Sequence, residues 1–161
     1  VRLSVHDPWL SDGYLRAEGL EPVSLEEAIG CSDVLFLLAG VTVENEGFLH
    51  RDLLETIRED ATVVLASRAE IVAFDDFLDL AGSGAFRAAV DVFPEEPVPP
   101  DSDIRSTSNV LFSSHLAGGL NASYARIRET MLDDIGQILK GLPPLRMQQA
   151  DPKLAPKMRS R

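Results

Sequence analysis

Short apolar runs and amphipathic stretches alternate along most of this 161-residue chain. Apolar runs bounded by turn residues predict β-strands at residues 2–6, 21–23, 33–38, 62–66, 86–92 and 110–112. Helical spacing of apolar residues and capping signals predict helices at residues 11–18, 24–30, 51–57, 75–81 and 121–140. Because strands and helices alternate over short connections, the pattern favours an α/β fold of the doubly wound class, with a parallel sheet covered by helices on both faces.

Several element ends carry their own signals. Ser24 and Glu27 form a capping box at the start of one helix, and residues 82–84 close another with glycines. The runs at 33–38 and 62–66 are nearly continuous, which is typical of strands buried on both faces. The longest helix has apolar positions at Ile127, Met131, Ile135, Ile138 and Leu139. We expect one domain over residues 1–141 and a C-terminal tail, partly disordered, over 142–161.

The composition argues against nucleic-acid-binding, disulfide-bonded and membrane proteins. The chain is 45% hydrophobic, enough for a core, and its net charge of −11 argues against nucleic acid as a partner. Cys31 is the single cysteine, so an internal disulfide is impossible, which fits a reducing compartment. No apolar run approaches the length of a membrane span, and no signal peptide is visible. We therefore expect a soluble cytoplasmic protein that binds neither nucleic acid nor membrane.

Three residues with catalytic potential follow predicted strands. Arg68 follows the strand at 62–66, Glu96 follows 86–92, and His115 follows 110–112. The carboxyl ends of parallel strands share one edge, so these side chains are expected to converge there. An Arg fork can bind a carboxylate, and an imidazole held by a carboxylate can pass protons near neutral pH. The alternatives are an ordinary surface Arg, a solvated acidic loop and a structural His. Since the three His and one Cys are scattered, no metal site is expected.

Asp7 ends the first predicted strand. In a dinucleotide-binding fold an acid there accepts hydrogen bonds from the adenosine ribose and favours NAD over NADP. The alternative is a turn-forming Asp before Pro8. The G-x-G-x-x-G turn that should precede such an acid is not in this chain, and Gly118-Gly119 has neither its position nor its spacing.

Two segments resemble a known family. Residues 88–97 resemble the "AALDVFEEEP" segment, and residues 109–118 the "NVLLTPHIAG" segment, of the D-isomer-specific 2-hydroxyacid dehydrogenases, which include phosphoglycerate and hydroxypyruvate dehydrogenases. Weaker likenesses at residues 7–8, 32–37 and 45–49 extend the resemblance over about residues 1–146.

The resemblance implies a Rossmann-type NAD-binding domain that serves hydride transfer between nicotinamide and C2 of a small D-2-hydroxy or 2-oxo acid. It implies that Arg68 binds the substrate carboxylate, that His115 is the acid/base, and that Glu96 pairs with His115. Asp91 would contact the carboxamide end of the cofactor. The residues that correspond to cofactor contacts are Asp7, Ala39, Ser67, Arg68, Asp91, His115, Ala117 and Gly118. The family also implies a homodimer.

The chain departs from the family in several places. Ala69-Glu70 stands where the family has Gly-Gly after the Arg, residues 38–42 replace a proline-bearing loop, and Leu65 replaces an Asn. These changes indicate a divergent substrate. The family's catalytic domain, first strand and Gly-rich turn are not in the sequence. We therefore expect a sheet without its first strand, a piece of a longer gene product, weak NAD binding and no activity by this chain alone.

Other functions share the same pattern. A non-catalytic, NAD-responsive module like the corepressors of this fold is the main alternative, and Ala69-Glu70 favours it. A receiver-like or methyltransferase α/β domain would show the same alternation of strands and helices. Neither of these two explains the spacing of Arg68, Glu96 and His115.

Overall fold

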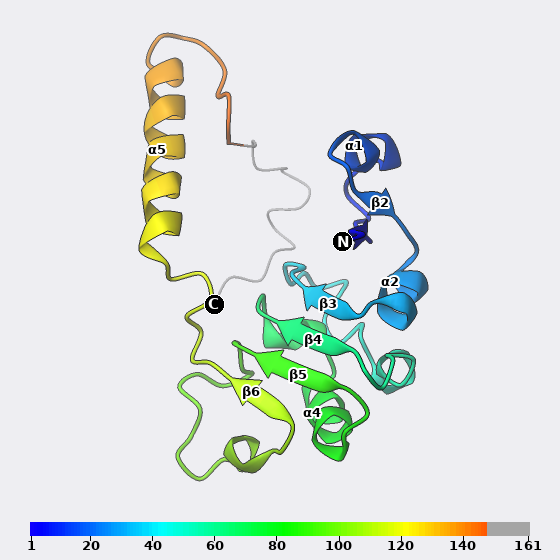
Figure 1. Cartoon of the computed structure of the whole chain (residues 1–161). Coiled ribbons are helices and arrows are strands. Elements are labelled where there is room, and N and C mark those ends of the chain that lie inside the picture. The colour runs from blue at the N-terminus through cyan, green and yellow to red at the C-terminus, as the bar shows by residue number, and fades with distance from the viewer. Residues whose placement is uncertain (148–161) are drawn as a thin grey trace.

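The computed structural model describes residues 1–147, and it arranges their strands in two parallel sheets (Figure 1). The smaller sheet pairs β1 (Ser4–Val5) with β2 (Glu21–Pro22). The larger sheet has the order β3-β4-β5-β6, made by Val34–Leu37, Thr62–Leu65, Arg87–Val90 and Val110–Phe112. The parallel α/β class is confirmed. No strand joins β1 to β3 within the described residues, as expected for a Rossmann sheet without its first strand.

The helices lie close to their predicted positions. They are α1 (Asp12–Ala17), α2 (Leu25–Cys31), α3 (Arg51–Leu54), α4 (Phe74–Ser83) and α5 (Asn121–Ile138). Ser24 and Glu27 form the predicted capping box on α2. Gly84 ends α4 at φ 89°, a left-handed conformation that glycine adopts without steric cost. Two 3₁₀ turns, η1 (Ala69–Ile71) and η2 (Asp103–Ser106), were not predicted, because such short segments have no periodicity to detect.

The core covers one face of the larger sheet. Val63 and Leu65 of β4 are fully buried there, in one cluster with Phe77 of α4. The ring of Phe77 lies 5.4 Å from that of Phe86, centroid to centroid. Because crossovers between parallel strands are almost always right-handed, strands that follow one another in sequence order place their connecting helices on the same face. Figure 1 accordingly shows α4 behind the sheet.

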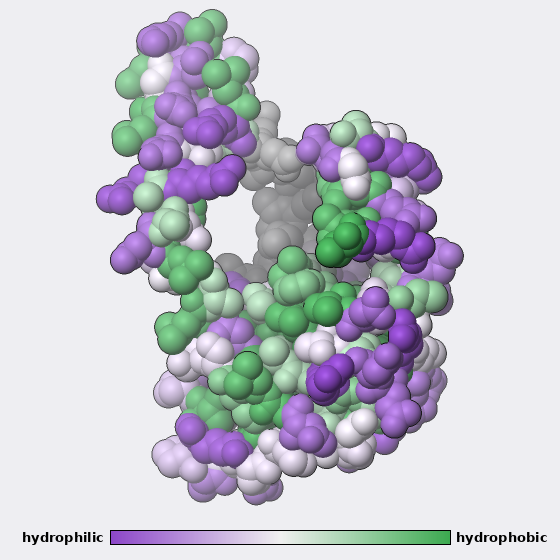
Figure 2. Space-filling model, viewed as in Figure 1, coloured by the Kyte–Doolittle hydropathy of each residue, from purple (hydrophilic) through white to green (hydrophobic). Residues whose placement is uncertain are grey.

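The opposite face of the larger sheet is exposed and apolar. Val34 and Phe36 of β3 are 52% and 59% exposed, and Leu111 of β6 is 73% exposed. Figure 2 shows hydrophobic side chains gathered over the strands on this face. The prediction that residues 33–38 form a strand buried on both faces is therefore wrong. Its apolar residues alternate between the core and solvent, because no helix of the described chain covers the second face.

Helix α5 extends away from the sheet (Figure 1). Its predicted apolar stripe is present, but Ile127, Met131 and Ile135 are about half exposed. Its one buried residue is Asp134, whose carboxylate accepts the backbone N–H groups of residues 145–147 at 2.6–3.3 Å. The start of the predicted tail is thus fixed to the helix. The rest of that tail, residues 148–161, lies outside the described residues.

Candidate active site

The carboxyl ends of β4, β5 and β6 leave the sheet side by side. The strands are in register up to this edge, with Leu65 opposite Val90 and Val90 opposite Phe112. Backbone hydrogen bonds continue beyond it, from the Asp91 N–H to the Leu65 carbonyl and from the His115 N–H to the Asp91 carbonyl. The segments that carry the candidate residues therefore begin from one rigid edge.

Glu96 and His115 contact each other at this edge. The His115 Nδ1 lies 2.7 Å from the Glu96 Oε2, and the Glu96 Oε1 accepts the Phe93 N–H at 2.9 Å. The two side chains are 35% and 42% exposed, so a ligand can reach the pair. With Nδ1 directed at a carboxylate, the ring keeps Nε2 as its second site for a proton.

The charges around Glu96 keep it ionised. Burial alone would raise the pKa of Glu96, but the hydrogen bonds from His115 and the Phe93 amide lower it. The positive charges of His115 and Arg68 act in the same direction. The pKa of Glu96 therefore lies below its usual value.

Arg68 leaves β4 in an extended conformation, with φ −147° and ψ 139°. Its side chain is exposed, and its Nη1 donates to the Ser67 carbonyl at 2.7 Å. The Ser67 hydroxyl is buried, and no hydrogen-bond partner for it occurs in the described part of the chain. The residues after Arg68 turn at once into η1, where Ala69 is 1% exposed. The guanidinium therefore remains at the surface of the edge, with donors available for an anion.

Asp91 is the buried acid of the site. It is 6% exposed, and its Oδ1 and Oδ2 accept the N–H groups of Leu116 and Ala117, each at 2.9 Å. Burial would raise the pKa of Asp91, but bonds from the Ala117 amide, the Ser113 hydroxyl and the Leu116 amide lower it, as does the charge of His115. The net pKa is lowered. The sequence did not predict that these amides and the Ser113 hydroxyl surround the Asp91 carboxylate, because the pattern of side chains does not indicate which backbone amides a carboxylate will reach.

The other predicted cofactor residues are divided between two places. Ala39 follows β3, the outer strand of the larger sheet, and Ala117 and Gly118 follow His115; all three are exposed. Asp7 lies two residues after β1, in the smaller sheet, which shares no strand with the sheet whose edge holds His115.

Asp7 forms a local turn, which was the alternative to a ribose contact. Its Oδ1 accepts the N–H groups of Trp9 at 2.8 Å and Leu10 at 3.1 Å. The structure thus accounts for Asp7 by local bonding, and its predicted ribose contact remains a prediction.

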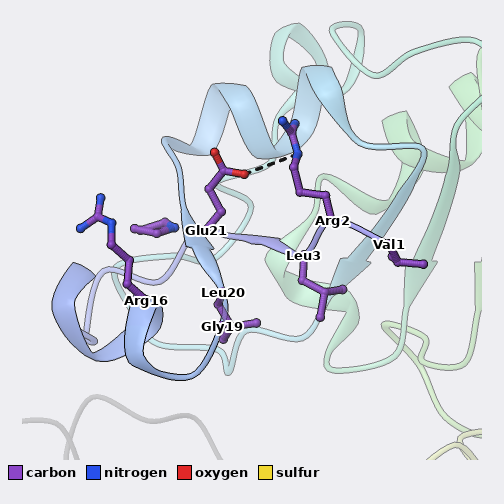
Figure 3. A pocket seen from close by; sticks show the side chains of 8 residues that line it. Val1, Arg2, Leu3, Arg16, Gly19, Leu20 and Glu21 are labelled. Atoms are coloured by element: carbon purple, nitrogen blue, oxygen red, sulfur yellow. Dashed lines mark ion pairs between the residues drawn. The ribbon is translucent and has the colours of Figure 1, made fainter.

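One open cavity lies away from these residues. It measures about 420 Å³ and is lined at the start of the chain and around β2 by Val1, Arg2, Leu3, Arg16, Gly19, Leu20, Glu21 and Pro22 (Figure 3). Arg2 and Glu21 form an ion pair across it at 3.5 Å. It contains none of the predicted site residues.

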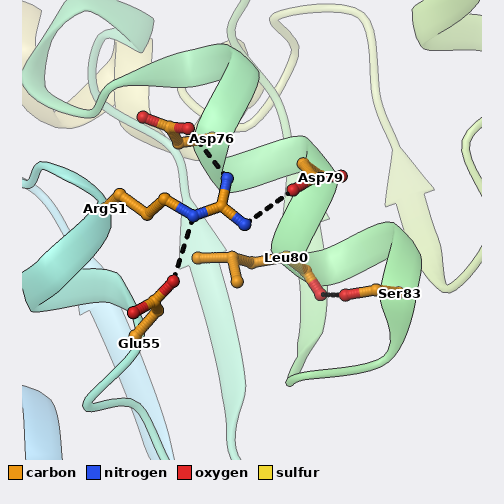
Figure 4. A network of polar contacts seen from close by, with 6 residues as sticks. All are labelled: Arg51, Glu55, Asp76, Asp79, Leu80 and Ser83. Carbon is orange, nitrogen blue, oxygen red and sulfur yellow. Dashed lines mark hydrogen bonds and ion pairs between the residues drawn. The ribbon is translucent and has the colours of Figure 1, made fainter.

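A charged cluster joins two helices on the far side of the core. Arg51 of α3 contacts Glu55, directly after the end of its own helix, and Asp76 and Asp79 of α4, at 2.9–3.0 Å (Figure 4). The hydrogen bonds that Arg51 donates to Asp79, Asp76 and Glu55 raise its pKa above the ordinary value. Because one guanidinium is shared by three carboxylates, the cluster fixes α3 against α4 rather than offering a binding site. Residues 1–147 contain no group of His, Cys, Asp or Glu placed to hold a metal ion, and no helix among them is long and apolar enough to cross a bilayer.

Comparison with known proteins identifies relatives. The family model described as "D-isomer specific 2-hydroxyacid dehydrogenase, NAD binding domain" matches residues 1–117. Hydroxypyruvate reductase of Blautia hydrogenotrophica is 25% identical over 130 residues, covering 80% of this chain and 40% of that protein. D-3-phosphoglycerate dehydrogenase of Archaeoglobus fulgidus is 27% identical over 144 residues, covering 89% of this chain and 27% of that protein.

Solved structures agree with these relatives. A phosphoglycerate oxidoreductase from Rhizobium etli superposes with a TM-score of 0.83 and 38% identity, over 93% of this chain and 45% of that one. A D-isomer specific 2-hydroxyacid dehydrogenase from Xanthobacter autotrophicus Py2, in complex with NADPH and MES, gives a TM-score of 0.70 and 25% identity, over 95% of this chain and 61% of that one. The chain spans less than half the length of the two curated relatives. The matched family model is that of a domain that binds NAD, a nicotinamide dinucleotide.

Proposed function

Since this chain belongs to the D-isomer specific 2-hydroxyacid dehydrogenase family, as NAD-binding domain, we propose that it serves hydride transfer between NAD and C2 of a small D-2-hydroxy or 2-oxo acid. The observation that carries the proposal is the 2.7 Å contact between Glu96 and His115 at the carboxyl edge of a parallel sheet, where Arg68 follows the adjacent strand β4. That edge is where α/β folds bind ligands.

The three side chains have separate tasks. In the direction of reduction, Arg68 binds the carboxylate of the 2-oxo acid through its fork of donors and orients the carbonyl. His115 donates the Nε2 proton to the carbonyl oxygen as C2 receives the hydride, and takes that proton back during oxidation. Glu96 holds the ring by Nδ1 and stabilises its protonated form. Bound NADH supplies the hydride.

The residues present fit only part of the cofactor. Ser67, Arg68 and residues 115–118 surround the edge where a nicotinamide would lie, and the buried hydroxyl of Ser67 has hydrogen-bonding capacity to spare. The Asp7 carboxylate is of the right type for a ribose. Residues 1–147 contain no G-x-G-x-x-G turn to hold the pyrophosphate, so we expect this chain to bind NADH weakly. Calorimetric titration with NADH tests this, and micromolar affinity would contradict it.

The substrate class follows from the site and from the relatives. Their names are those of hydroxypyruvate and glyoxylate reductases and of D-3-phosphoglycerate dehydrogenases, all acting on small hydroxy or oxo acids. Ala69-Glu70, directly after Arg68, favours a substrate of this class that differs from the acids used by the relatives. A homodimer in the cytoplasm belongs to the same proposal, and the half-exposed apolar stripe of α5 supports association.

The experiment uses the full gene product that contains this chain, assayed for NADH oxidation with a panel of 2-oxo acids. We expect His115→Gln to lower kcat/KM by about 10²–10⁴-fold. Arg68→Lys should mainly raise KM, because a Lys lacks the planar fork. His50→Gln, on an exposed His at the start of α3, is the matched control. Turnover that survives His115→Gln would refute the assignment. Retained NADH binding with no turnover on any acid would favour the NAD-responsive, non-catalytic module instead.

A further inference from the structure

The turn that carries His115 has an unusual backbone. His115 lies in the left-handed region with φ 57°, which residues other than glycine seldom occupy because the Cβ crowds the neighbouring carbonyl. The direction of the imidazole depends on this conformation. In an ordinary extended or helical conformation, the Cα–Cβ bond would point elsewhere and Nδ1 would lose its 2.7 Å contact with Glu96. Some other part of the chain must therefore hold residue 115 in place.

Asp91 holds three consecutive amides of this turn. Its carbonyl accepts the His115 N–H at 2.8 Å, and its two carboxylate oxygens accept the N–H groups of Leu116 and Ala117 at 2.9 Å each. The Ser113 hydroxyl also lowers the pKa of this carboxylate. One residue thus contacts His115 and the two residues that follow it.

Asp91 is itself fixed by the sheet. Its N–H donates to the Leu65 carbonyl at 2.9 Å, directly beyond the end of β5, and its side chain is 6% exposed. A buried carboxylate with charge-assisted bonds to backbone amides is a stiff connection, since leaving either amide unpaired is unfavourable. Asp91 therefore fixes the turn that carries His115 to the end of β5.

We propose that Asp91 positions His115: by holding the amides of residues 115–117, Asp91 keeps His115 in the left-handed conformation that brings the imidazole to Glu96. The resemblance to the family assigned Asp91 a contact with the cofactor. In the structure each of its carboxylate oxygens accepts one of the protein's own amides, so holding the turn is a role that Asp91 has before any cofactor binds. The reaction that this positioning serves rests on the proposed function. The contacts between Asp91 and the turn, and the first test of them, are independent of that function.

The first test uses Asp91→Asn in the chain itself. An Asn side chain offers one oxygen and one NH₂, so it can accept only one of the two amides and would direct a donor at the other. We expect hydrogen exchange of the Leu116 and Ala117 amides to accelerate at least about tenfold. We also expect the pKa of Glu96, followed by carboxyl NMR, to rise toward its ordinary value of 4.5, because His115 no longer contacts it.

Two further variants keep the test decisive. Glu95→Gln makes the same charge change at an exposed neighbour and should leave both signals unchanged. Ser113→Ala removes an exposed hydroxyl that lowers the pKa of the same carboxylate, and should shift both signals in the same direction by less. If Asp91→Asn does not fold, Ser113→Ala supplies the result. Unchanged exchange and an unchanged Glu96 titration in the folded variants would overturn the proposal.

The full gene product separates positioning from cofactor contact. A positioning role predicts that Asp91→Asn lowers kcat while the Kd for NADH changes less than about threefold. Weaker NADH binding with an unchanged Glu96 titration would refute positioning and support the cofactor contact. Absence of turnover in the parent protein would count against the proposed dehydrogenase function, but the exchange and titration results for Asp91 would stand.

Discussion

Replacing Glu96 by Gln should remove a pH-dependent part of the stability of this chain. Both carboxylate oxygens of Glu96 are engaged, one by the His115 ring at 2.7 Å and one by the Phe93 N–H at 2.9 Å. The Gln amide has nearly the same size but a single oxygen, so it can accept only one of these bonds and carries no charge.

The magnitude follows from the exposure of the pair. A hydrogen bond to a charged group contributes about 1.5–3 kcal/mol when it is shielded from water. The side chains of Glu96 and His115 are 35% and 42% exposed, so solvent screening reduces the expected loss to about 1 kcal/mol. For a chain of this size such a loss lowers Tm by about 2–4 °C.

The sign of the pH dependence follows from the pKa of Glu96, which the fold lowers below the ordinary value of 4.5. A carboxyl with a lowered pKa stabilises the folded state fully above its unfolded pKa, and this stabilisation is lost as pH falls through the folded pKa. The difference between the parent and Glu96→Gln should therefore be fully present above about pH 6 and disappear in acid, where both side chains are neutral.

Thermal and urea unfolding, followed by circular dichroism across this pH range, measure the difference. The control is Glu95→Gln, an exposed acid one residue away, which should change the free energy of unfolding by less than about 0.5 kcal/mol. Equal losses for the two variants, or a loss by Glu96→Gln that persists in acid, would refute the reasoning.

Three other predictions concern the fold. Phe77→Ala, at a fully buried ring, should cost about 3–5 kcal/mol in urea unfolding, whereas Phe36→Ala, at a ring 59% exposed, should cost less than about 0.5 kcal/mol. Equal costs would mean that the second face of the sheet is covered. Gly84→Ala forces an alanine to φ 89° and should lower the free energy of unfolding by about 1–2 kcal/mol, so an unchanged urea midpoint would contradict the left-handed cap. Asp134→Asn should speed hydrogen exchange of the amides of residues 145–147, while the exchange rates of the α5 amides stay the same. Unchanged exchange at residues 145–147 would show that the Asp134 carboxylate does not hold these amides.

The pairing of Glu96 with His115 could be predicted from sequence because two adjacent parallel strands deliver both residues to one edge. The role of Asp91 could not. Its partners are backbone amides 25 and 26 residues away, and they are within reach only because His115 adopts a left-handed conformation that no side-chain pattern announces. The burial of Asp134 was missed for the same reason.

The exposure of Phe36 has a different cause. A hydrophobic pattern tells which side chains gain from burial, but not whether anything is present to cover them. The continuous apolar run at 33–38 was therefore interpreted as buried on both faces, whereas the crossovers of this sheet cover only one. Asp7 shows the limit of an argument from a single residue: an Asp before Pro is typical of a turn as well as of a ribose contact, and the structure shows the turn.

The strand order β3-β4-β5-β6 has a consequence for how the chain folds. Each strand of the larger sheet pairs with the one synthesised just before it, so every contact between strands closes a short loop and the contact order stays low for a parallel sheet. The sheet can thus grow strand by strand behind the ribosome, with the Phe77–Phe86 contact formed before β6 has been made. Glu96 can contact His115 only after β6 has joined the sheet, because His115 follows β6. The candidate site is consequently the last part of this sheet to assemble, and a chain stalled before residue 110 would have its core but no acid/base pair.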